Sequence, residues 1–180
     1  FGGDGASNQG AVFESMNFAK AYDLPVIFVL EDNGYAESTF KSYTTAGDLC
    51  DRAAGFGIPS AQVDGVDFFA VCEAANVAVE RARNGGGPSF IHCEVPLFFA
   101  HFEGDQETYR ATDEVENLRA ERDCLKLFRD RVTKKGTIEN KELDTIEAAM
   151  IERATAAIET AIVAPRPPAS ALFENVYANY

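Results

Sequence analysis

The sequence lacks the features of a membrane-spanning or secreted protein. No apolar run approaches the roughly 20 residues that a transmembrane helix needs. The chain also does not begin with a basic segment followed by an apolar stretch, so no secretion signal is visible. We therefore expect a cytoplasmic protein with no membrane partner.

Cysteine is scarce and shows no metal-binding spacing. The chain has 4 cysteines and no C-x-x-C pair. Each cysteine stands in an apolar or helical context, which favours reduced core thiols of a cytosolic protein over a zinc site. The four are Cys50, Cys72, Cys93 and Cys124.

Positive charge is in short supply as well. The 16 Lys and Arg residues stand against 29 Asp and Glu, for a formal net charge of -13 over 180 residues. This balance argues against binding to nucleic acid or to an anionic membrane. A phosphate ligand is still compatible with it, because backbone amides and a metal can bind phosphate without basic side chains. A hydrophobic content of 46% is enough for the core of one globular domain.

The hydrophobic pattern predicts alternating strands and helices after a glycine loop at 2–10. Such alternation implies right-handed crossovers and a parallel sheet, so the expected fold class is α/β, with a parallel sheet flanked by helices. The predicted strands are 26–30, 59–63 and 89–95, and the predicted helices are 11–22, one or two turns within 51–57, and 67–84.

The character of the chain changes near residue 110. Charged, helical patterns over 112–132 and 139–163 follow, separated by Lys134-Lys135-Gly136. We divide the chain into an α/β part, 1–110, and a C-terminal helical extension of the same domain, 111–180.

Three loops are expected at the carboxyl ends of the strands, where open parallel sheets bind ligands: 2–10, 31–38 and 98–110. The first holds Asp4 between two glycines at the mouth of a helix. Glycines let backbone amides approach a phosphate, and a helix start adds positive potential. Magnesium, which combines one or two carboxylates with substrate phosphate, would balance the charge of Asp4.

Gly-Asp-Gly and Asn-Gly are each common turns when taken alone. Here GDGASNQG is followed by a helix, by Leu24-Pro25, by an apolar strand and by EDNGYAES. This combination closely resembles the thiamine diphosphate-binding motif of the alpha subunit of 2-oxo-acid and acetoin dehydrogenases. The resemblance continues through HFEGDQETYR at 101–110 and, more loosely, into the tail at 173–177. Because a strand normally precedes such a glycine loop, we expect a fragment that lacks the N-terminal part.

The resemblance implies a site for thiamine diphosphate and magnesium. Asp4 and Asn33 would bind magnesium through their side chains, and Tyr35 through its carbonyl group. His101 matches the active-site histidine of a mobile loop. The cofactor-binding set that the resemblance implies comprises Gly3, Asp4, Gly5, Ala6, Asn33, Tyr35 and Ala36.

The same resemblance implies cleavage of acetoin or a 2-oxo acid and transfer of the acyl group to a lipoyl acceptor. The expected partners are a beta subunit, in a heterotetramer of two alpha and two beta subunits, and a lipoyl-bearing acyltransferase. The acidic loop with Glu103 and Asp105 favours the acetoin branch over the pyruvate branch.

Two positions depart from the family pattern. The family usually has two asparagines where this chain has Asp32-Asn33, so an extra charge stands beside the metal ligand. A basic residue usually precedes the histidine, whereas residues 97–100 are uncharged here. Two alternatives therefore stay open: a pyruvate or branched-chain 2-oxo-acid dehydrogenase, and a scaffold subunit that has lost cofactor affinity.

The sequence gives less support to other functions and to other site residues. No G-x-G-x-x-G with an acid at the next strand end and no Walker sequence supports a nucleotide-binding domain. His92, within an apolar strand, is expected to be a hydrogen-bonded core or sheet residue. Glu14, on the first helix, is expected to have a structural role.

Overall fold

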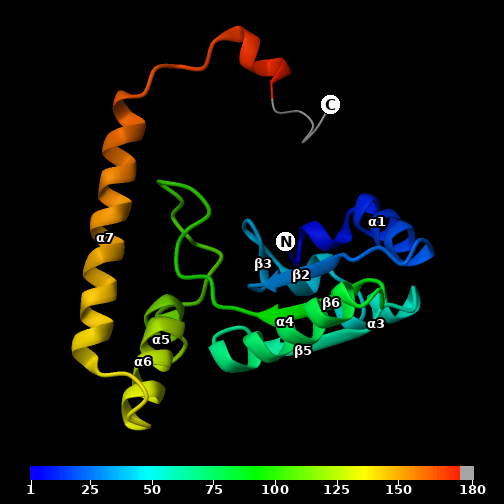
Figure 1. The fold of residues 1–180 in the computed structure, drawn as a ribbon, viewed down its shortest axis with the longest axis horizontal. Coiled ribbons are helices and arrows are strands. Elements are labelled where there is room, and N and C mark those ends of the chain that lie inside the picture. The colour runs from blue at the N-terminus through cyan, green and yellow to red at the C-terminus, as the bar shows by residue number, and fades with distance from the viewer. Residues whose placement is uncertain (175–180) are drawn as a thin grey trace. The chain divides into compact units, whose positions relative to one another are not determined.

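The computed structural model describes residues 1–174 of the chain (Figure 1). The described residues form two compact units, one of residues 1–131 and one that begins at Val132. Part of the tail that resembles the dehydrogenase family, residues 175–177, lies outside the described residues.

A four-stranded parallel sheet is the frame of the first unit, and it confirms the predicted fold class. Figure 1 shows β2, β6 and β5 side by side. Because all pairings are parallel, the carboxyl ends of the strands share one edge of the sheet. The strands, in hydrogen-bonding order, are β1 (Gly2–Gly3), β2 (Ile27–Asp32), β6 (Ser89–Glu94) and β5 (Ser60–Asp64).

Helices cover both faces of this sheet because successive strand residues point to opposite sides. Helices α1 (Gly10–Ala21) and α3 (Leu49–Gly55) pack on one face, and α4 (Phe68–Arg83) packs on the other. The core of the first face consists of Met16, Leu30, Leu49, Ala53, Ile58 and Phe90. The core of the second consists of Ala78, Ile91 and Cys93.

Aspartates define where two of these helices begin. The carboxylate of Asp48 accepts hydrogen bonds from the backbone N–H groups of Cys50 and Asp51, at 2.7 and 3.0 Å. Asp67 caps α4 in the same way, through the N–H groups of Phe69 and Ala70. Each cap satisfies N–H groups that have no partner inside the helix.

The segment after β2 is more ordered than the sequence predicts. Strands β3 (Tyr35–Ala36) and β4 (Thr39–Phe40) form a short antiparallel pair, and the short helix α2 (Lys41–Thr44) follows. The hairpin therefore brings Lys41 back toward the end of β2.

The prediction of a single helix over 112–132 is wrong. The structure has two helices, α5 (Glu114–Glu121) and α6 (Cys124–Lys134). Arg122, between them, forms an ion pair with Asp64 at 2.8 Å. Asp123 then accepts a hydrogen bond from the N–H of Leu125 at 2.9 Å, which is the pattern of a new helix start.

The second unit contains the long helix α7 (Asn140–Val163, Figure 1) and a short 3-10 helix, η2 (Ala169–Phe173). In residues 1–174, no helix combines the length and the apolar character that crossing a membrane requires.

The prediction that all four cysteines are core thiols is wrong for Cys124. All four are free, but Cys124 is exposed, whereas Cys93 is buried and Cys50 and Cys72 are half-buried. The break before α6 places Cys124 in the first turn of a surface helix.

Candidate functional site

The parallel pairing of β1 with β2 brings the two halves of the predicted motif together. Gly3 lies opposite Glu31 in the register, so Asp4 and Asn33 follow neighbouring strand ends. The two loops also touch at Gly5, where a β-carbon would lie 2.4 Å from the β-carbon of Ala36. The two loops can therefore approach this closely only because glycine, at position 5, has no β-carbon. Ala6 begins the 3-10 helix η1 (Ala6–Asn8) directly after it.

Asp4 is fully buried, and neither of its carboxylate oxygens has a hydrogen-bond partner within residues 1–174. Its backbone carbonyl, by contrast, accepts a hydrogen bond from the Ser7 hydroxyl at 2.6 Å. Burial, reinforced by the negative charge of Asp32, raises the pKa of the Asp4 carboxyl. Burying a charge without a counter-charge lowers the stability of the folded protein. A cation bound at this carboxylate would supply the counter-charge.

The second half of the motif is a tight turn. The side-chain oxygen of Asn33 accepts a hydrogen bond from the N–H of Tyr35 at 3.0 Å. Gly34 has a φ of 83°, a left-handed conformation that glycine adopts most easily. The amide oxygen of Asn33 keeps a second lone pair for another partner.

These residues fit magnesium better than a metal bound by protein side chains alone. The described part of the chain has no group of three or more His, Cys, Asp or Glu side chains that could hold a metal ion. Magnesium usually takes one or two carboxylates and completes its shell with water and phosphate oxygens. One unpartnered carboxylate, Asp4, with the Asn33 amide following the neighbouring strand end, matches that requirement.

Asp32 is the residue whose surroundings the sequence did not reveal. It is buried, and its Oδ2 atom contacts both the Nζ of Lys41 and the Nε2 of His92, the latter at 2.8 Å. Burial acts to raise the pKa of Asp32, but hydrogen bonds from Lys41 and His92 outweigh it and hold the pKa below its usual value. His92 is thus a core residue with one bonded ring nitrogen, while its Nδ1 has no partner within residues 1–174.

The structure does not join His101 to Asp4 or Asn33. His101 is exposed, and its backbone N–H donates a hydrogen bond to Asp105 at 3.4 Å. Residues 99–105 line a hollow that includes none of the residues of the two motif loops. The catalytic role that the sequence predicts for His101 therefore stays a prediction.

The end of the His101 loop is nevertheless connected to the turn at Asn33–Tyr35 through side chains. Arg110, whose side chain is almost fully buried, forms ion pairs with Glu107 and Glu114, both at 2.9 Å. Glu114 in turn accepts a hydrogen bond from the Tyr35 hydroxyl at 3.0 Å. The sequence gives no periodic signal for this bridge, because its members lie 79 residues apart.

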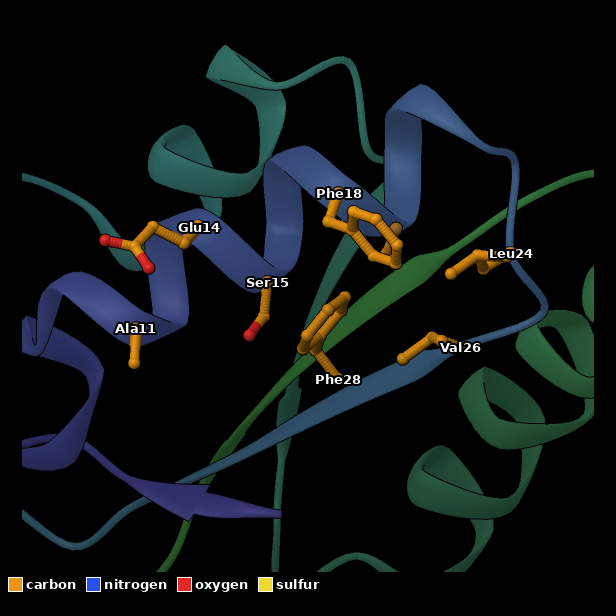
Figure 2. Close-up of a pocket in the computed structure, with 8 residues that line it drawn as sticks. Ala11, Glu14, Ser15, Phe18, Leu24, Val26 and Phe28 are labelled. Carbon is orange, nitrogen blue, oxygen red and sulfur yellow. The ribbon is translucent and has the colours of Figure 1, made fainter.

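A separate apolar groove runs between α1 and β2 (Figure 2). Ser15, Phe18 and Phe28 point into it in Figure 2, and Glu14 stands near one end. None of the residues that line this groove belongs to the predicted cofactor set, so it is distinct from the candidate site.

Comparison with known proteins identifies the family. The family model described as "Dehydrogenase E1 component" matches residues 1–170. The chain belongs to the dehydrogenase E1 component family. Membership of this family implies thiamine diphosphate and magnesium as cofactors.

Three relatives of this E1 chain are alpha subunits. The alpha subunit of acetoin:2,6-dichlorophenolindophenol oxidoreductase is 54% identical in Cupriavidus necator and 45% identical in Bacillus subtilis, each over 100% of this chain. The pyruvate dehydrogenase E1 component subunit alpha of Rhizobium meliloti is 39% identical over 97% of the chain. The chain spans about half the length of these relatives, between 50% and 54% of each.

Gly5→Ala should disturb the site by forcing the glycine loop away from Ala36. The added β-carbon would stand far inside contact distance, so we expect a loss of about 1–3 kcal/mol in the free energy of unfolding. Denaturant unfolding of the full-length protein measures this. Gly2→Ala is the matched control, because its β-carbon would meet nothing within 4 Å, and its effect should stay within about 0.5 kcal/mol. Equal effects of the two substitutions would contradict the close contact.

Asp4→Asn should stabilise the metal-free protein at neutral pH. Because the pKa of Asp4 is raised above 3.8 on folding, the ionised carboxylate costs stability as the pH rises from 3.8 through the raised value. Removing the charge should raise the Tm, by roughly 2–4 °C for each kcal/mol gained in a chain of this size. Thermal melts with a chelator present, at pH 7 and near pH 4, measure the difference. A lower Tm for the variant at pH 7 would count against the unpaired charge.

Proposed function

We propose that this chain is the cofactor-binding part of the alpha subunit of an acetoin dehydrogenase that depends on thiamine diphosphate and magnesium. The enzyme would cleave acetoin, or a 2-oxo acid, and pass the acyl group to a lipoyl acceptor. The observation that carries the proposal is the buried, unpartnered carboxylate of Asp4 beside the contact between Gly5 and Ala36. The higher identity to the acetoin relatives, 54% against 39% for a pyruvate relative, supports the acetoin branch.

The residues of this chain would bind and orient the cofactor. Asp4 and Asn33 would bind magnesium through side-chain oxygens, and Tyr35 through its carbonyl group. Backbone groups of Gly3, Gly5, Ala6 and Ala36 would complete the cofactor set. When bound, thiamine diphosphate supplies an electron sink for cleavage of the bond beside a carbonyl group.

His101 would contribute from its exposed loop by holding or moving a proton at the substrate oxygen. An exposed histidine is suited to this task, since its imidazole can both donate and accept a proton. The bridge from Arg110 through Glu114 to Tyr35 would fix the end of that loop relative to the metal ligands.

The names of the relatives, which are alpha subunits, support a beta subunit as a partner. We propose a beta subunit, assembled in a heterotetramer of two alpha and two beta subunits, and a lipoyl-bearing acyltransferase as acceptor. A branched-chain or pyruvate dehydrogenase is the alternative within the family.

A scaffold subunit without cofactor affinity is the second candidate function. It is favoured by the uncharged residues 97–100, at the place where the family usually has a basic residue. In the structure these residues are held by other cations: Arg110 donates a hydrogen bond to the Leu97 carbonyl at 2.6 Å, and Arg119 lies over the ring of Phe99. Cofactor binding distinguishes the two candidates.

Titration calorimetry should detect magnesium-dependent binding of thiamine diphosphate to the full-length chain purified with its beta subunit. Asp4→Ala should weaken this binding by at least about 100-fold, because even residues that only support a metal ligand cost up to that much. Binding that does not need magnesium would refute the assignment of Asp4. Absence of binding in the unchanged complex would favour the scaffold function.

His101→Ala should separate binding from catalysis. If His101 transfers a proton, turnover of acetoin should fall by about 10²–10⁴-fold while the calorimetric affinity for thiamine diphosphate stays close to that of the unchanged protein. The same assay with pyruvate and with branched-chain 2-oxo acids identifies the substrate branch. Unchanged turnover in the variant would remove His101 from the active site.

A further inference from the structure

Asp32 places a second carboxylate next to the candidate metal site. Its side chain is 4% exposed, and its Oδ1 atom accepts a hydrogen bond from the N–H of Gly34 at 3.2 Å. Within residues 1–174, Asp4 and Asp32 are the buried carboxylates, but only the carboxylate of Asp32 contacts charged or polar side chains at hydrogen-bond distance. The two buried acids at this sheet edge therefore differ. The carboxylate of Asp32 has side-chain partners, and that of Asp4 has none within the described residues.

Lys41 is the cation that compensates Asp32. Two contacts hold it there. Its backbone N–H donates a hydrogen bond to the Gly34 carbonyl at 2.8 Å, and its ammonium group contacts Asp32 at the end of β2. The Lys41 side chain is 35% exposed, so the ammonium group lies at the border between the buried carboxylate and solvent. His92 adds a hydrogen bond to the same carboxylate oxygen from the neighbouring strand.

Asp32 and Lys41 lie beside the candidate metal ligands. Gly3 pairs with Glu31 in the parallel register, so Asp4 and Asp32 are the next residues along neighbouring strands, and Asp32 directly precedes Asn33. Lys41 contacts the carboxylate of Asp32, so both charges influence the electrostatic potential at the candidate site. A change in either charge should be felt by any ion bound there.

We infer that Lys41 is a positioning residue that sets the net charge of the metal–diphosphate site. By neutralising Asp32, it leaves Asp4 as the buried carboxylate available to the metal, so the site attracts a cation without repelling the diphosphate. This inference rests on the proposed function.

A role of Lys41 in setting the charge and a merely structural role predict different changes in the affinity for the cation and for the cofactor. Without Lys41, two negative charges would strengthen binding of a bare cation and weaken binding of the negatively charged cofactor. Without the charge of Asp32, the two effects would be reversed. A general loosening of the turn would instead weaken both ligands together.

The test uses the full-length chain purified with its beta subunit. Calorimetry measures the affinity for Mn²⁺ alone, as the probe of the cation site, and for thiamine diphosphate at saturating magnesium. In Lys41→Met the Mn²⁺ affinity should rise and the thiamine diphosphate affinity should fall, each by about tenfold. Asp32→Asn, which keeps the shape and the hydrogen bond to Gly34, should shift both affinities in the opposite directions.

The double variant Lys41→Met/Asp32→Asn should return both affinities close to those of the unchanged protein, because the two charges are removed together. Lys20→Met is the matched control. It removes an exposed ion pair with Asp23, at 2.7 Å, at the C-terminal end of α1, whereas Asp4 precedes the N-terminal end of that helix. It should change neither affinity.

Three results would overturn the inference. Parallel weakening of both ligands in Lys41→Met, with no recovery in the double variant, would make Lys41 a structural residue. Unchanged affinities in both single variants would show that the site does not sense these charges. Failure of the unchanged complex to bind thiamine diphosphate would instead refute the proposed function, and the inference with it. If Lys41→Met does not fold, as judged by its thermal melt, the near-isosteric Asp32→Asn carries the test.

Discussion

The carboxylate of Asp4 is held out of water at the carboxyl edge of a parallel sheet, and neither oxygen has a hydrogen-bond partner within residues 1–174. Such a group lowers the stability of a folded protein unless a counter-charge arrives. The parallel register beside β2 and the close approach of Gly5 to Ala36 bring the Asp4 loop and the Asn33 turn to this same edge of the sheet. A cation bound at this edge would supply the counter-charge that the Asp4 carboxylate lacks within the described residues.

The contrast between Asp4 and Asp32 gives this edge its electrostatic asymmetry. Both side chains are buried, yet the pKa of Asp4 is raised and that of Asp32 is lowered. The difference arises from Lys41 and His92, which reach Asp32 from α2 and β6. Pairs of acids whose pKa values are pushed apart by their surroundings are characteristic of functional sites.

The two loops of the proposed enzyme are connected through side chains rather than through the backbone. Tyr35 supplies a hydroxyl group to Glu114 while its carbonyl belongs to the predicted metal set. Glu114 holds Arg110, at the end of the loop that carries His101. A change at the turn of Asn33–Tyr35 can therefore reach the His101 loop through the side chains of Glu114 and Arg110.

The sequence by itself determined the α/β fold, the three longer strands of the sheet, the helices that cover it and the long helix α7, and it pointed to the two-part motif. Continuous apolar runs, helical spacing and turn residues are local signals, and the motif lies within a short stretch of chain. Only the tertiary structure decided that Lys41 and His92 compensate Asp32, that Arg122 and Asp123 split one predicted helix into two, and that Cys124 is exposed. These features depend on contacts such as that between residues 32 and 92, which adjacent strands bring together although 60 positions separate them along the chain.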